Sequence, residues 1–237
     1  HLVIIPEFFD WEQQSITFDI VLHAGSLLAI IFYYRRRIVE IITSIFKVKK
    51  TVDVENSSLI KNLVLTTIPT VIIYFFVKDY IEETFSSINV IKFTLIIGGI
   101  LLILADYFSK RNKSKLMNSK IAILIGIGQG ISLIRGVSRS GAMLTIGLFY
   151  SVRRDVLLEY VFLASIPIIL AGLLLKVVDY VSNPQGEDVL FLTIGFLTSA
   201  LSGYIAIKLL NKFVNKGIFI FSGIYRIALA LILIIVK

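Results

Sequence analysis

Apolar residues gather along this chain in long runs that are separated by short polar segments. A helix that crosses a bilayer needs about 20 consecutive, mainly apolar residues. Six runs are close to this length, at residues 15–34, 59–77, 90–107, 156–178, 189–207 and 218–236. The pattern predicts an all-α membrane protein, a polytopic helical bundle that forms one integral membrane domain over residues 1–237.

A seventh apolar stretch, residues 120–150, is interrupted in its middle. The interruption reads Arg135-Gly136-Val137-Ser138-Arg139-Ser140-Gly141, and neither flanking half is long enough to cross a bilayer. The stretch therefore predicts two half-length helices that meet at a break at membrane depth. Charged residues at that depth are costly, so the break is the first candidate for a functional site.

The basic residues indicate how this stretch enters the membrane. Most of the chain's 24 lysines and arginines fall at residues 35–50, 110–120, 153–154 and 208–216. These segments all lie on one side of the membrane only if residues 120–150 re-enter. If this stretch crossed the membrane once, the later basic segments would change sides and the charge asymmetry between the two sides would disappear. The positive-inside rule thus favours a re-entrant segment, cytoplasmic basic loops, and a first residue, His1, on the outer side of the plasma membrane.

A short apolar piece, a polar connector and a full span occur twice, in about residues 1–107 and about residues 120–237. The two copies enter from opposite sides, which predicts inverted repeats with interrupted helices and a binding site near the midplane. The first copy is N-terminally incomplete, and the chain starts at His1 without an initiator methionine. We therefore expect the natural protein to carry further residues before His1.

The amino-acid composition agrees with a membrane protein and limits the kinds of binding partner. The chain is 57% hydrophobic and only 17% charged, with a mean hydropathy of +0.88, whereas soluble domains carry about 25% charged residues. The pI of about 9.6 could indicate nucleic acid, but the cations lie between apolar runs, so lipids are expected partners and nucleic acid is not. The absence of cysteine excludes disulfides and thiolate metal sites.

The residue types at the break suit a phosphate group. Gly136 and Gly141 allow tight turns that expose backbone N–H groups, and a helix N-terminus attracts anions. Ser138 and Ser140 add hydroxyl donors, and Arg139 adds a planar fork that matches phosphate oxygens. The alternative is structural: serines in membrane helices often bond to backbone carbonyls, and arginines near helix ends often extend toward water.

Other polar residues are ambiguous from sequence alone. The amide of Gln129 could bond within the helix bundle or contact a ligand, and His1 at a chain start carries little information. His23, Glu159 and Arg226 are intramembrane polar groups for which packing or pairing is the favoured interpretation.

Gly128-Gln129-Gly130, followed by residues 136–141 (G-V-S-R-S-G), resembles the undecaprenyl-pyrophosphate phosphatase family, also known for bacitracin resistance. The resemblance continues through residues 18–30, Arg153, residues 159–163, Pro167 and Tyr225-Arg226. Two positions depart from the family pattern, with Arg135 in place of a proline and Met143 in place of a threonine.

This resemblance implies an enzyme that hydrolyses undecaprenyl or another polyprenyl pyrophosphate to the monophosphate and inorganic phosphate, recycling a carrier lipid for envelope glycan synthesis. It implies Mg²⁺ or Ca²⁺ as cofactor, held by glutamates upstream of His1, with no metal ligand in this chain, and it is compatible with a homodimer. The implied catalytic residues are His1, Arg139 and Ser138, and the implied phosphate-binding residues are Ser140, Gly136, Gly141 and Gln129.

A lipid-phosphate transporter or flippase is the alternative function. Inverted repeats with broken helices suit alternating access as well as a fixed catalytic site. Release of phosphate from a pyrophosphate lipid distinguishes the two functions.

Overall fold

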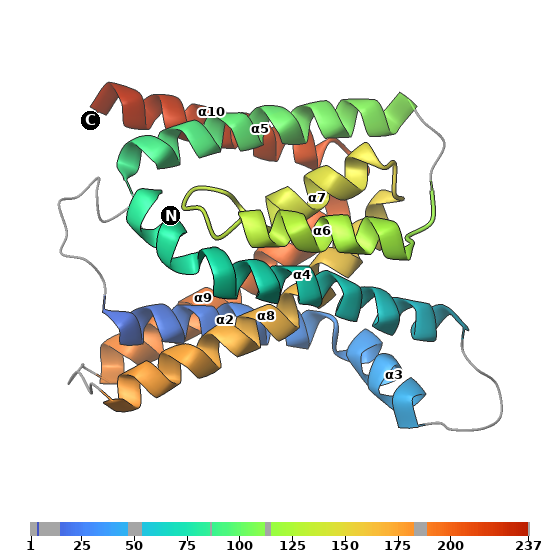
Figure 1. The fold of residues 1–237 in the computed structure, drawn as a ribbon, viewed down its shortest axis with the longest axis horizontal. Coiled ribbons are helices and arrows are strands. Elements are labelled where there is room, and N and C mark those ends of the chain that lie inside the picture. The colour runs from blue at the N-terminus through green and yellow to red at the C-terminus, as the bar shows by residue number, and fades with distance from the viewer. Residues whose placement is uncertain are drawn as a thin grey trace. The chain divides into compact units, whose positions relative to one another are not determined.

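In this computed structural model, the structure describes Ile4 and residues 15–46, 54–85, 87–111, 115–182 and 189–236. Apart from one isolated bridge, the ordered elements of these residues are helices (Figure 1). Their bounds are α2 (Ile16–Tyr33), α3 (Arg35–Phe46), α4 (Val54–Thr84), α5 (Ile88–Arg111), α6 (Ser119–Ile131), α7 (Arg139–Phe149), α8 (Arg154–Ser182), α9 (Val189–Phe213) and α10 (Ile218–Val236).

Five of the described helices, α4, α5, α8, α9 and α10, are long and apolar enough to cross a membrane, and α2 with α3 passes the same test as a pair. This confirms the predicted polytopic all-α class. Several helices exceed the apolar runs, because helix formation continues into the polar ends: α4 covers 31 residues. Pro69 and Pro167 lie inside α4 and α8 without ending them.

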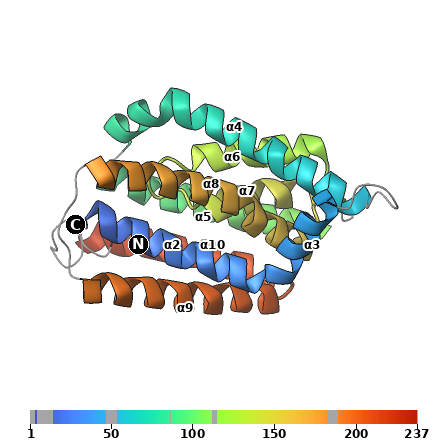
Figure 2. The ribbon, with the colours of Figure 1, turned by 90° about the horizontal axis from the view of Figure 1, so that it is seen from below.

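Contacts divide the chain into two compact units. The first comprises His1–Arg35 and Ile166–Leu209, and within it α9 lies alongside α2 (Figure 2). The rings of Phe18 and Phe191 stack with centroids 4.6 Å apart, and the hydroxyls of Ser26 and Ser199 are 3.0 Å apart. A β-carbon on Gly25 would lie 3.0 Å from Cβ of Ser199. Small residues thus let these two helices approach closely.

The second unit comprises Arg36–Ser165 and Leu210–Lys237. In it α10 packs along α5, α4 packs along α6, and α7 contacts both α5 and α6 (Figure 1). Glycines bring α5 and α10 together, because a β-carbon on Gly99 would lie 2.7 Å from the carbonyl oxygen of Gly223, and the reverse distance is the same. Ile125, Met143 and Val161 belong to its fully buried core.

The segment around α6 and α7 turns back on itself. The backbone N–H of Lys115 donates to the carbonyl oxygen of Ser151 at 2.8 Å, and Lys115 forms a parallel bridge with Val152. The chain therefore enters and leaves this hairpin at one end, through helices of 13 and 11 residues. The two predicted half-length helices are confirmed and form a hairpin, whereas their re-entry into a membrane stays a prediction. The inverted repeat stays a prediction, because the counterpart around His1 lies outside the described residues.

Candidate functional site

The break between α6 and α7 is built from a tight turn and a capped helix start. Ser138 is the N-cap of α7, and its hydroxyl accepts a hydrogen bond from the N–H of Gly141 at 3.1 Å. Gly136 has φ of +85°, and a β-carbon there would lie 3.0 Å from Cα of Ile91 on α5. Only glycine combines this backbone angle with so close an approach.

Two side chains from neighbouring helices hold the turn in place. The hydroxyl of Thr94 on α5 donates to the carbonyl oxygen of Arg135 at 2.9 Å. From α10, Nη2 of Arg226 donates to the carbonyl oxygens of Gly136 at 3.1 Å and Thr94 at 3.3 Å. The turn is therefore bonded through its backbone, which leaves the donors at the start of α7 for another partner.

Arg226 lies underneath the start of α7 and is only 8% exposed. A β-carbon on Gly141 would lie 2.8 Å from Nη1 of Arg226, and one on Gly98 would collide with the same guanidinium. These two glycines thus make the space in which the cation sits. Its Nε has no hydrogen-bond partner among the residues that the structure describes.

Arg139 is the first residue of α7 and is partly buried. Within the described ranges it makes no hydrogen bond or ion pair. The hydroxyls of Ser138 and Ser140 lie 3.4 Å apart beside it. The predicted residues Gly136, Ser138, Arg139, Ser140 and Gly141 therefore meet at one point, where two guanidiniums and a helix N-terminus create positive potential.

A further arginine, Arg154, lies at the opposite end of the hairpin, where the chain continues into α8, and its side chain is 13% exposed. Arg154 forms an ion pair with Asp106 of α5 at 2.5 Å, and Lys110 forms another with the same carboxylate at 3.0 Å. The Asp106 side chain is completely buried. Arg154 also donates to the hydroxyl of Ser109 at 3.0 Å. This cation is neutralised inside the protein.

Gln129 lies in a polar seam between α4 and α6. Thr66 and Thr70, one turn apart on α4, donate to the carbonyl oxygens of Ala122 and Gly126 on α6, each at 2.9 Å. The amide of Gln129 donates to the hydroxyl of Thr70 at 3.0 Å and is 1% exposed. Its Oε1 has no hydrogen-bond partner in the described part of the chain. The seam fixes α6 against α4.

The structure also describes the two positions that depart from the family pattern. Met143 is fully buried in the apolar core, and the side chain of Arg135 is exposed. His1 lies outside the described residues. Sequence reasoning favoured a packing or pairing role for Arg226 and missed its place at the break. An arginine inside the last apolar run was the available signal.

The described residues do not form a metal site, since they contain no group of three or more histidines, aspartates or glutamates that could hold an ion. Among them, the charged side chains at the break are arginines, and the hydroxyls of Ser138 and Ser140 and the first N–H groups of α7 can donate hydrogen bonds. Such a set binds oxygen-rich anions.

Comparison with known proteins identifies the class. A family model described as "Bacitracin resistance protein BacA" matches residues 1–232. An undecaprenyl-diphosphatase of Elusimicrobium minutum is 38% identical over 235 residues, which are 99% of this chain and 88% of that relative. An undecaprenyl-diphosphatase of Ruthia magnifica is 33% identical over 236 residues, covering 98% and 89% of the two chains.

The match extends over almost the whole chain, including the break and the helices that hold it. The chain is thus a polytopic membrane protein, and it belongs to the bacitracin resistance protein BacA family.

Proposed function

We propose that this protein is a membrane hydrolase that cleaves undecaprenyl pyrophosphate. One water molecule is consumed, the bond between the bridging oxygen and the terminal phosphorus breaks, and the products are the lipid monophosphate and inorganic phosphate. The family match and the names of the relatives support this reaction, and they favour hydrolysis over lipid transport. The product would return to envelope glycan synthesis as carrier lipid.

The observation that carries the proposal is the unneutralised pair Arg139 and Arg226 at the start of α7. Hydrolysis of a pyrophosphate needs its negative charge to be balanced and its transferred phosphoryl group to be held in line. Arg139 would clamp the pyrophosphate oxygens. Ser138, Ser140 and the first N–H groups of α7 would complete the cradle.

Gly136 and Gly141 serve this cradle through the backbone, because a side chain at either position would displace its neighbours. Gln129 would act from the α4–α6 seam, either on substrate directly or by fixing the end of α6. His1 remains the predicted nucleophile or general base. Mg²⁺ or Ca²⁺ would be held by glutamates upstream of His1 and would supply charge stabilisation at the phosphoryl group.

The proposed orientation places the basic loops on the cytoplasmic side of the plasma membrane, with the break opening toward the opposite side. Its support is the charge distribution of the sequence. The apolar faces of the long helices would carry the prenyl tail.

Phosphate release from undecaprenyl pyrophosphate by purified protein tests the function. We expect release with the parent protein and a loss of about 10²–10³-fold in kcat for Arg139→Ala. The matched control is Arg153→Ala, since Arg153 is 61% exposed and already paired with Asp155. Equal rates for Arg139→Ala and the parent, or lipid movement across vesicles without phosphate release, would refute the proposal.

A further inference from the structure

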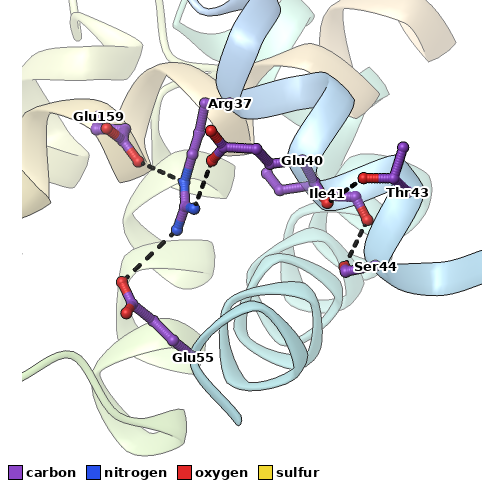
Figure 3. Close-up of polar contacts among 7 residues, drawn as sticks. All are labelled: Arg37, Glu40, Ile41, Thr43, Ser44, Glu55 and Glu159. Atoms are coloured by element: carbon purple, nitrogen blue, oxygen red, sulfur yellow. Dashed lines mark hydrogen bonds and ion pairs between the residues drawn. The ribbon is translucent and has the colours of Figure 1, made fainter. Parts of the chain in front are cut away.

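Helix α3 is anchored to its own unit by one arginine (Figure 3). Nε of Arg37 lies 3.1 Å from Oε1 of Glu159 on α8, and its Nη1 lies 3.1 Å from Oε2 of Glu40. Its Nη2 lies 3.8 Å from Oε1 of Glu55 on α4. Each pair reaches the solvent through its glutamate and is weak alone, but all three share one guanidinium. Together they fix which face of α3 points toward the protein.

The opposite edge of α3 is apolar and uncovered. Val39 is 58% exposed and Ile42 is 47% exposed, and a spacing of three residues places them on the same face of a helix. With 12 residues, α3 is about 18 Å long and too short to cross a bilayer. A short helix with such an apolar edge, next to membrane spans, is typical of helices that lie along a membrane surface with that edge toward the acyl chains.

The charges beside this edge are positive. Arg35 and Arg36 are exposed, and Arg36 makes no hydrogen bond or ion pair within the described ranges. Arg35 donates to the carbonyl oxygen of Phe32 at 2.9 Å and keeps its charge. The negative charge of Glu40 is balanced by Arg37. The surface that accompanies the apolar edge is therefore cationic.

We propose that Arg35, Arg36, Val39 and Ile42 form a binding surface for anionic phospholipid. The apolar pair would contact acyl chains, and the two arginines would contact the negatively charged headgroups. A second copy of this chain is a poor occupant, because two identical cationic surfaces repel each other. The proposal does not depend on the catalytic function, so either can fail without the other.

The chain contains no cysteine, so single cysteines report on single positions. A fluorophore is attached at Val39→Cys or, as the water-facing control, at Glu40→Cys. Each protein is placed in nanodiscs that contain brominated phosphatidylcholine or brominated phosphatidylglycerol at the same mole fraction. We expect bromine quenching at position 39 and little at position 40, with stronger quenching at position 39 by phosphatidylglycerol.

Removing the arginines tests the headgroup preference. Arg35→Gln and Arg36→Gln, introduced into the Val39→Cys protein, should each lower the association of phosphatidylglycerol relative to phosphatidylcholine by about fivefold. Arg153→Gln should leave the ratio unchanged. Equal quenching by the two lipids in the Val39→Cys protein overturns the proposal even if the glutamine variants fail to fold. Absence of quenching, or crosslinking of position 39 between copies, overturns it as well.

Discussion

Positive charge is balanced differently at the two ends of the α6–α7 hairpin. At the end where the hairpin joins α8, Arg154 and Lys110 share the buried carboxylate of Asp106. At the break, Arg226 is bonded only to backbone carbonyl oxygens, and Arg139 has no polar partner among the described residues. A buried ion is costly unless it is paired. The positive charge at the first end is balanced within the protein, whereas on the proposed function the charge at the break is balanced by the anionic substrate.

The largest expected effect comes from removing one ion-pair partner of Asp106, at the end of the hairpin that joins α8. Arg154→Met leaves Asp106 with only Lys110, and loss of one partner of a buried pair costs about 3–5 kcal/mol of unfolding free energy. The midpoint of thermal unfolding in detergent should fall accordingly. Arg154→Met combined with Asp106→Leu should recover most of the loss, and a single variant as stable as the parent would contradict this assignment.

Removing positive charge from the break should lower activity and leave thermal stability unchanged. Arg139→Met is expected to lower kcat by about 10²–10³-fold without lowering the thermal midpoint, because no internal pair is lost. Arg139→Lys keeps the charge but loses the planar fork, so its rate should lie between those of the parent and Arg139→Met. Inorganic pyrophosphate should raise the midpoint of the parent and not that of Arg139→Met. A drop in stability as large as that of Arg154→Met would show that the two ends are alike.

A smaller effect is expected at the turn. Gly136→Ala forces a β-carbon into a left-handed conformation, which costs about 1–2 kcal/mol, and it moves the carbonyl that Arg226 binds. Gly217→Ala is a matched control, because Gly217 also has positive φ, at +83°, but a β-carbon there meets nothing within 4 Å. Gly217→Ala should lose only the stability that backbone strain costs, whereas Gly136→Ala should lose more because its β-carbon also meets Thr94 and Ile91. Only Gly136→Ala should lose phosphate release. Equal activity losses would mean that backbone strain alone is responsible.

The smallest effect is expected at the helix cap. Ser138→Ala should cost about 1 kcal/mol of unfolding free energy, as should Asn118→Ala at the cap of α6. Only the change at Ser138 should lower the rate. Ser138→Asp preserves a cap but adds a negative charge at the break, so it should retain stability and abolish stabilisation by pyrophosphate. Pyrophosphate binding by Ser138→Asp as tight as in the parent would argue against a charge-based site.

Sequence patterns predicted the structural features that are determined by residues close together in the chain. The apolar runs gave the long helices, and the sequence around Gly136 and Gly141 gave the turn and the start of α7. Loop charge predicted that residues 120–150 turn back, and the hairpin agrees with this, whereas the side of the membrane on which its ends lie stays a prediction. Arg226 escaped this reasoning because its position follows from the close packing of α5 and α10 at Gly99 and Gly223, which no local pattern specifies.

Gln129 shows the same limit. Whether its amide meets a ligand or the protein depends on the hydroxyls of Thr66 and Thr70, which lie far earlier in the chain and face α6 only after folding. Hydroxyls one turn apart in a membrane helix have many other possible partners. The sequence therefore left both interpretations of Gln129 open.

The seam between α4 and α6 has a consequence for the order of biosynthesis. Because α4 is made first, Thr66 and Thr70 are already present when the short α6 emerges from the ribosome, so α6 can dock on protein rather than lipid. Arg226 belongs to α10, which is synthesised after the other described helices. A nascent chain without α10 thus has the whole turn but lacks the side chain that holds the carbonyl of Gly136. On the proposed function, the anion site at the break is therefore complete only after α10 has been made.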